Sequence, residues 1–166
     1  MASQESGIAE TPAAAHDNGG HPSEATIHKL KLWMRVVGAL YILNAVILGL
    51  SFALPAFAES TVGARVPDAE LSGPMYEFAL DTWLMFGFEM LVVGAALLWA
   101  SRDAWANRVL AGTVTALELV RGILDDLVWI ARGYPIVPYI AWIVFHAVVA
   151  GTGILALSAA RADART

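Results

Sequence analysis

The sequence contains no cysteine and carries few charged residues for its length. Without cysteine there is no disulfide framework, no thiolate nucleophile and no cysteine-based zinc or iron–sulfur site. Charged residues make up 15% of the 166 residues, whereas a soluble domain usually carries about 25%. The chain has no basic patch of the kind that binds nucleic acid, and no Walker A, Gly-x-Ser-x-Gly or Gly-x-Gly-x-x-Gly motif. Nucleic-acid-binding, nucleotide-binding and hydrolase functions therefore have no support.

Apolar residues, by contrast, are abundant: they make up 58% of the chain, and the mean hydropathy is +0.61. Four apolar runs cover about residues 32–54, 76–100, 109–131 and 136–158. Each run is long enough to cross a hydrocarbon core of about 30 Å as a helix. Short connections between the last three runs force neighbouring spans to be antiparallel. The sequence therefore predicts an all-α integral membrane protein, in which residues 29–160 form an up-down-up-down four-helix transmembrane bundle in a lipid bilayer.

The two ends of the chain are predicted to lie outside the bundle. Residues 1–28 are rich in alanine, serine and glycine and have no apolar period, which predicts a disordered tail. Residues 161–166 form a short C-terminal tail. His16, His21 and His28 could bind a metal ion, but scattered histidines in a flexible tail more often bind none, and we expect no metal site.

The long connection at residues 55–75 contains proline, glycine and charged residues, and is predicted to be an exposed loop. Near its start, Ala56-Phe57-Ala58 is similar to a signal-peptidase site. The apolar run before it exceeds the roughly 7–15 residues of a signal-peptide core, and a long acidic tail precedes that run. We therefore expect the first span to be retained as an anchor.

Lysine and arginine are unevenly distributed about the predicted spans. Seven flank one side, namely Lys29, Lys31, Arg35, Arg102, Arg108, Arg161 and Arg165. Only Arg65 and Arg132 flank the other side. Because positively charged connections stay in the cytoplasm, both termini are predicted to be cytoplasmic, which agrees with an even number of spans.

Small and aromatic residues indicate how the spans pack and where they end. Ala45, Gly49 and Ala53 share one helix face, as do Ala147 and Gly151, and such faces allow close helix packing. Five aromatic residues lie near span ends and are predicted to be interfacial anchors, namely Trp33, Tyr76, Trp99, Trp105 and Tyr134.

The third apolar run contains a polar stripe. Glu118, Arg121, Asp125, Trp129 and Arg132 fall within an arc of roughly 80° on a regular helix, and Asp126 is adjacent. Centring each span on the bilayer places several polar groups within roughly 5 Å of the midplane, namely Asn44, Glu89, Glu118, Arg121 and His146. A charged group facing lipid at this depth costs on the order of 3 kcal/mol, so we expect these groups to turn inward and meet.

Two interpretations of this stripe remain open. In the structural one, Arg121 lies between Glu118 and Asp125 on its own helix, Arg132 reaches back toward Asp125, and these ion pairs only fix the helix register. In the functional one, five carboxylates face two arginines, so the surplus holds a proton, a small cation or a polar ligand. The candidate binding residues are Asp81, Glu89, Glu118, Arg121, Asp125, Asp126 and His146.

Two cofactor classes do not fit the spans. A carboxylate-bridged di-iron bundle needs Glu-x-x-His pairs, and Glu118 has Arg121 at that spacing. Haem held by two histidines needs two within the membrane, and only His146 lies there. We therefore expect no cofactor and no catalytic residue.

Three segments together resemble the BphX-like family of small bacterial four-span membrane proteins, which are DoxX-like in general style. The segments are LKLWMRVVGALYILNA (30–45), ALDTWLMFGFEMLVVGAALLWASRD (79–103) and LELVRGILDDLVWIARG (117–133). Its strongest elements are Asp81-Thr82-Trp83 with Glu89, and Glu118-x-x-Arg121 with Asp125-Asp126. The resemblance covers about residues 29–158 and implies a bacterial cytoplasmic (inner) membrane protein, without implying a mechanism.

These observations favour a non-enzymatic membrane protein, either an accessory or a small-ligand-binding subunit, whose acidic intramembrane cluster opens toward the outer face. The alternative is a proton-linked small-solute carrier or channel that acts as an oligomer. A membrane enzyme using the same acidic residues ranks last. Expected partners are the lipid bilayer and either further copies of the chain or a larger membrane complex, but not nucleic acid.

Overall fold

The computed structural model describes residues 20–65, 70 and 72–166, and within these ranges all regular structure is helical. Residues 1–19 of the predicted disordered tail lie outside the described part. In chain order the elements are α1 (Glu24–Ala53), α2 (Pro55–Arg65), α3 (Pro74–Ala100), η1 (Ser101–Asp103), α4 (Arg108–Leu117), η2 (Glu118–Leu124), α5 (Asp125–Ala131) and α6 (Ile136–Asp163). Three of them, α1, α3 continued by η1, and α6, are long and apolar enough to cross a membrane.

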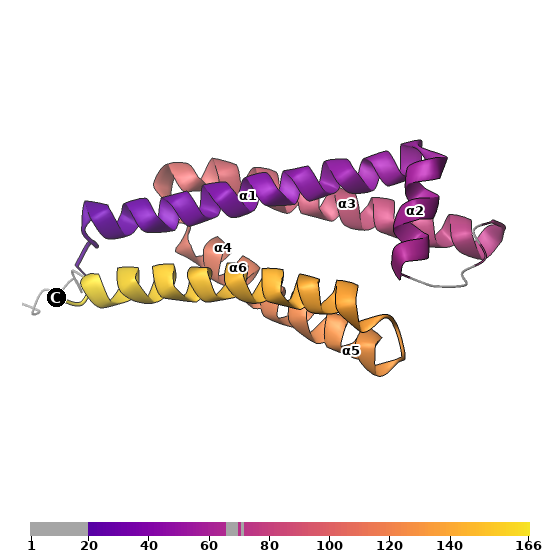
Figure 1. The fold of residues 1–166 in the computed structure, drawn as a ribbon. Helices are drawn as coiled ribbons and strands as arrows, with labels where there is room; N and C mark the ends of the chain where they lie inside the picture. The colour runs from indigo at the N-terminus through magenta and orange to yellow at the C-terminus, as the bar shows by residue number, and fades with distance from the viewer. Residues whose placement is uncertain (1–19, 66–69, 71) are drawn as a thin grey trace, which may run out of the picture.

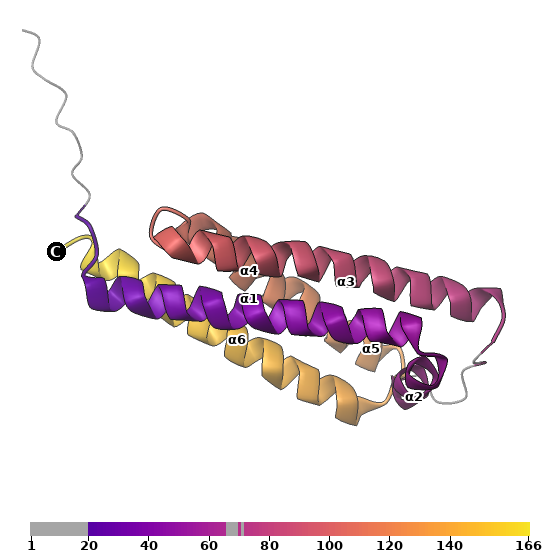
Figure 2. The same cartoon turned by 90° about the horizontal axis from the view of Figure 1, so that it is seen from above.

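The long helices lie side by side in two pairs (Figures 1 and 2). In one pair α1 runs along α3; in the other, α6 runs along the adjoining elements α4, η2 and α5. Gly133, with a φ of 93°, takes the left-handed conformation that follows many helix C-termini, and the chain then turns through Pro135 into α6. The start of α1 and the end of α6 lie at the same end of the molecule.

The main cluster of buried hydrophobic residues lies toward that end. Its residues come from the start of α1, the end of α3, the region from η1 to α4, and the second half of α6. They are Leu30, Trp33, Met34, Val37, Leu97, Ala100, Ala104, Ala111, Val114, Val149, Ala156 and Leu157. We call this half of the molecule the core end. The other half, the open end, comprises 41–53 of α1, α2, 74–90 of α3, η2, α5, and 136–146 of α6.

Glycines allow the helices of the core end to approach closely. A Cβ atom added to Gly94 of α3 would lie 2.7 Å from the carbonyl oxygen of Gly38 in α1, so these backbones are nearly in contact. A Cβ on Gly153 of α6 would lie 2.8 Å from the ring of Trp33. By contrast, the predicted packing positions Gly49 and Gly151 have nothing within 4 Å of such an atom. The close packing predicted at these two glycines is therefore absent, and Gly49 lines a hollow between α1 and α3 together with Leu84 and Gly87.

Three other sequence predictions need correction. The predicted loop at 55–75 contains the helix α2, which lies across the end of α1 (Figure 1). Ala58 and Val62 of α2 are buried, and Ala56-Phe57-Ala58 is part of this helix. The predicted tail also ends earlier than position 28, because α1 begins at Glu24. Trp33 is not an interfacial anchor: its side chain is buried, and its indole N–H donates to the carbonyl oxygen of Val149 over 3.1 Å.

A carboxylate at the end of α6 bonds to residues at the start of α1. Asp163, the last residue of α6, accepts hydrogen bonds from the backbone N–H of Ser23 (2.6 Å) and the hydroxyl of Thr26 (2.9 Å) at the start of α1. The apolar part of α6 ends several residues earlier, so this contact lies at the polar end of the helix. The hydrogen bonds from Ser23 and Thr26 hold the pKa of Asp163 below its usual value of 3.8.

The outer surface of the helices is strongly apolar. Among the large side chains that remain exposed are Phe78, Val109, Val137 and Leu155, which are between 66% and 81% accessible. A soluble monomer rarely exposes so continuous an apolar surface, whereas lipid chains cover it without loss.

Candidate functional site

Glu118 is the central residue of the candidate site, because it is the one acidic side chain that the described structure buries almost completely. It is the first residue of η2 and is 2% exposed. The hydroxyl of Tyr41, from α1, donates to its Oε1 atom. Its Oε2 atom lies 2.6 Å from Nδ1 of His146, from α6, so a hydrogen bond joins these two groups. We call Tyr41, Glu118 and His146 the Glu118 cluster.

The Glu118 cluster depends on the close approach of η2 and α6. Gly122 is buried on η2, and a Cβ atom there would lie 2.3 Å from Cγ of His146. Only glycine leaves room for the imidazole ring at this position. The ring also packs against Trp142 and Phe145, whose centroids lie 5.9 Å and 5.4 Å away. The imidazole is therefore held between a glycine on one helix and two aromatic rings on its own.

The segment that carries Glu118 is a π-helix, with hydrogen bonds from residue i to i+5, within an otherwise α-helical run. This wider turn changes which residues share a face. Glu118 faces α1 and α6, whereas Arg121 contacts Glu89 of α3, and its guanidinium group lies 4.6 Å from the ring of Phe86. The predicted pairing of Arg121 with Glu118 and Asp125 is therefore wrong, because it assumed a regular α-helix.

The other predicted site residues do not join the Glu118 cluster. Glu89 and Arg121 form an ion pair that is about half exposed. Asp81 and Asp125 are exposed and Asp126 is partly buried. Of the charged midplane groups that were expected to turn inward, Glu118 is buried, whereas Glu89 and Arg121 meet each other but stay exposed. Arg132 places its guanidinium group 5.8 Å from the ring of Trp129, and within the described residues it forms no ion pair with Asp125.

A cavity of about 330 Å³ adjoins the Glu118 cluster between α1 and α6. Its walls are apolar and aromatic, apart from Tyr41, Asn44 and His146. The lining residues are Leu40, Tyr41, Leu43, Asn44, Ile47, Met90, Ala141, Trp142, Phe145 and His146. The volume lies at the lower end of the range for small-molecule pockets, about 300–1,000 Å³. Within the described ranges, no group of three histidine or acidic residues is placed to hold a metal ion.

Sequence reasoning missed Tyr41, Gly122 and the cavity. Tyr41 lies three residues before Asn44, and two polar side chains one helical turn apart in an apolar span are a usable signal. No comparable signal marks Gly122, because glycines are frequent in membrane helices and only the neighbouring His146 ring shows its role.

Comparison with known proteins identifies the family of this chain. A family model described as BphX-like matches residues 27–162, which takes in all the long helices. The chain belongs to the BphX-like family. Two curated relatives share 29% identity over 103 residues, covering 60% of this chain and 70% of theirs: an uncharacterized BphX-like protein from Burkholderia cepacia and another from Paraburkholderia xenovorans strain LB400. No solved structure matches the chain.

The predicted membership of the BphX-like family is thereby confirmed. The match begins in α1 and ends within the last turn of α6, so it contains Tyr41, Glu118 and His146.

Proposed function

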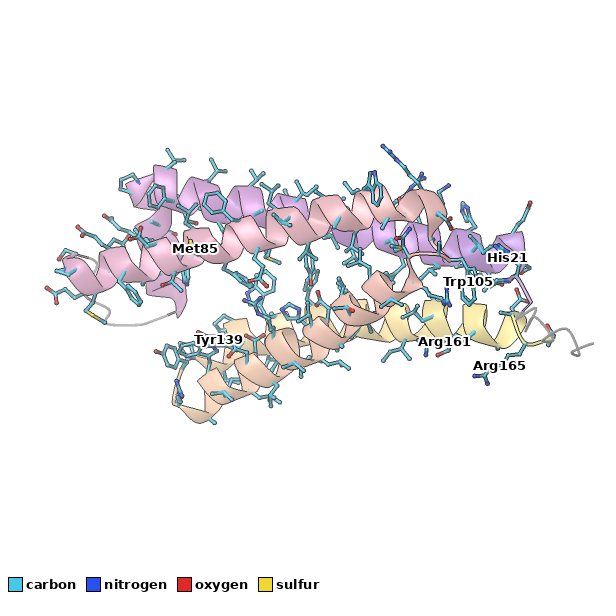
Figure 3. All side chains as sticks on the ribbon, turned by 180° about the vertical axis from the view of Figure 1, so that it is seen from behind. His21, Met85, Trp105, Tyr139, Arg161 and Arg165 are labelled. Carbon is cyan, nitrogen blue, oxygen red and sulfur yellow. The ribbon has the colours of Figure 1, made fainter. Side chains whose placement is uncertain are left out.

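We propose that this BphX-like protein spans the bacterial inner membrane four times, with both termini in the cytoplasm. The third span in chain order is the run of α4, η2 and α5, which is continuously helical from Arg108 to Ala131. Each of these three elements alone is too short to cross a membrane. Support for the orientation comes from the clustering of Arg161 and Arg165 with His21 and Trp105 at one end, away from Met85 and Tyr139 (Figure 3). Positively charged ends remain on the cytoplasmic side.

Within that membrane, the protein acts as a non-enzymatic, small-ligand-binding subunit, either as an oligomer or within a larger membrane complex. One observation carries this proposal: the 330 Å³ cavity lies directly beside a buried carboxyl group whose two oxygens are both bonded. A bonded carboxyl group fixes the positions of Tyr41 and His146, and these two residues form part of the cavity wall. The result is a pre-formed pocket with a rigid polar side, which is typical of ligand sites.

The test is to ask whether the cavity retains a molecule. Full-length protein purified in mild detergent is extracted with organic solvent, and the extract is compared by mass spectrometry with that of Ala141→Phe, which fills the cavity. Ala147→Phe, on the same helix but outside the cavity, is the matched control. We expect a compound that is enriched in wild type and control and depleted in Ala141→Phe. Identical extracts from all three proteins would contradict the proposal.

A proton-linked carrier is the second candidate, and the hydrogen bond between Glu118 and His146 favours it. A carboxyl–imidazole pair at the centre of a membrane protein can hold and release one proton, which is the element that such carriers need. In liposomes loaded with a pH-sensitive dye, a carrier gives a proton flux that Glu118→Gln abolishes and Asp125→Asn leaves unchanged. An equal flux in wild type and Glu118→Gln liposomes would rule this candidate out.

A further inference from the structure

We propose that the ligand of the cavity is a compact, uncharged lipophile carrying one hydroxyl or carbonyl group, and that it enters sideways from the bilayer. This inference rests on the ligand-binding function proposed above and adds the chemical class of the ligand. Three features of the cavity support it: the composition and position of its walls, the state of Asn44, and the distribution of charge around it.

The walls of the cavity favour a lipophile that arrives through the lipid. Seven of the ten lining residues have hydrophobic side chains, and the indole of Trp142 carries the one N–H group among these seven. Two of them, Leu43 and Ile47, are 55% and 39% exposed on the outer surface of α1, so the cavity borders the surface that lipid chains cover. Because these residues belong to the middle of an apolar span, a ligand need not leave the bilayer to reach them.

Asn44 is the polar group that an occupant would satisfy. Its amide nitrogen donates to the thioether sulfur of Met90 over 3.3 Å, and a thioether is a weak acceptor. The structure shows no hydrogen bond to the amide oxygen within the described residues. An amide near the centre of a bilayer without strong partners is unfavourable. A ligand hydroxyl both donates and accepts, and a carbonyl accepts from the amide N–H, so either group would satisfy Asn44.

The charges around the cavity favour an uncharged molecule. Glu118 does not line the cavity, and its two carboxylate oxygens are bonded to Tyr41 and His146. The imidazole of His146, which does line the cavity, therefore already has a partner in Glu118. Arg121, the arginine nearest to Glu118 in the sequence, is paired with Glu89 and lies outside the lining. A ligand with a formal charge would therefore be buried here without a counter-charge, at a large desolvation cost.

Four probes with one ring system test these requirements: 2-naphthol, naphthalene, the anion 2-naphthalenesulfonate and the cation 2-naphthylmethylammonium. Full-length protein in lipid nanodiscs is brought to equilibrium with each probe by dialysis, and uptake by empty nanodiscs is subtracted. We expect saturable binding of 2-naphthol, binding of naphthalene weaker by about tenfold because one hydrogen bond is missing, and no saturable binding of either ion. Ala141→Phe should abolish binding of both neutral probes, and Ala147→Phe should not.

Asn44→Leu separates the ligand class from the binding function. We expect this variant to bind naphthalene as wild type does and to lose the tenfold preference for 2-naphthol. If wild type binds both neutral probes equally, or binds an ion more tightly, the proposed ligand class is wrong although the cavity still binds ligands. If no probe binds more tightly to the wild-type protein than to Ala141→Phe, both the ligand-binding function and the ligand class are wrong. The cavity is then filled by a lipid chain or by a second copy of the protein.

Discussion

The two halves of the molecule are held together by different kinds of contact. At the core end, helices meet backbone to backbone at Gly38 and Gly94, and the side chains around them are buried. At the open end, α5 has no buried residue, and the helix pairs are joined by polar contacts at Glu118 and Arg121 beside a cavity. In a bilayer, the hydrophobic effect does not drive helices together, so both close packing and hydrogen bonds are needed.

If the protein binds a ligand as proposed, this difference separates stability from function within one molecule. A close-packed interface tolerates little change, because added volume forces the helices apart. A cavity with a few fixed polar groups leaves space for a ligand and limits where it can bind. We therefore expect substitutions at the core end to affect folding most, and substitutions at the open end to affect binding as well as folding.

The largest effect is expected for Gly94→Leu. A Cβ at this position already lies 2.7 Å from the backbone oxygen of Gly38, which cannot rotate away, so α1 and α3 must separate. We expect a loss of about 3 kcal/mol or more in the free energy of unfolding. The control is Gly49→Leu, at a glycine in the open half of α1 with nothing within 4 Å, which should change stability by less than about 0.5 kcal/mol.

Thermal unfolding in detergent, followed by circular dichroism, measures both glycine variants. Equal melting temperatures for Gly94→Leu and Gly49→Leu would show that the core end is not packed more tightly than the open end, and the comparison of the two halves would fail.

A smaller loss of stability, with a loss of binding, is expected for Glu118→Ala. The substitution removes the carboxylate that accepts from the Tyr41 hydroxyl and bonds the His146 ring. Both polar groups then lose this hydrogen bond in the protein interior. We expect a cost of about 2 kcal/mol. Asp125→Ala, which removes an exposed carboxylate of the same helical run, should cost less than about 0.5 kcal/mol.

Chemical denaturation and the 2-naphthol binding assay measure these two acidic variants. If Glu118→Ala and Asp125→Ala are equally stable and bind 2-naphthol equally, the Glu118 cluster neither joins the helices nor shapes the cavity.

The long helices could be predicted from the sequence, because apolar runs of sufficient length leave few alternatives in a bilayer. The partner of Arg121 could not be predicted. A helical wheel assumes a uniform turn, and the π-helical turn at Glu118–Leu124 directs Glu118 and Arg121 to different helices. The helix α2 was missed for a related reason: its proline and glycine are typical of a loop, and Ala58 and Val62 are buried only by contacts with the rest of the fold.

The same limit applies to the candidate site. Glu118, Glu89, Arg121 and His146 could be selected because charged or titratable groups within apolar spans are costly and few. The cavity depends on how α1, η2 and α6 are spaced. Gly153 of α6 allows the approach of Trp33 from α1, and Gly122 of η2 allows the approach of His146 from α6. Neither glycine differs, in sequence alone, from Gly49 or Gly151, where an added Cβ would have nothing within 4 Å.

The smallest effect is expected for Asp163→Asn, which also lies at the core end. Hydrogen bonds from Ser23 and Thr26 lower the pKa of Asp163 in the folded protein below its unfolded value. The ionised carboxylate therefore stabilises the folded protein above the unfolded pKa, and this contribution is lost as the pH falls through the lower, folded pKa. Because the group lies at the surface, the effect on the melting temperature should be small.

Melting temperatures recorded from about pH 6 down to about pH 3 test this expectation. The wild-type protein should lose stability toward the acidic end slightly faster than Asp163→Asn, which keeps an oxygen acceptor for Ser23 but cannot ionise. Asp103→Asn, an exposed carboxylate at the same end of the molecule that bonds only within its own turn, serves as the control and should follow the wild-type curve. If Asp163→Asn also follows the wild-type curve, the contact between the start of α1 and the end of α6 does not stabilise the core end, and close packing alone accounts for its rigidity.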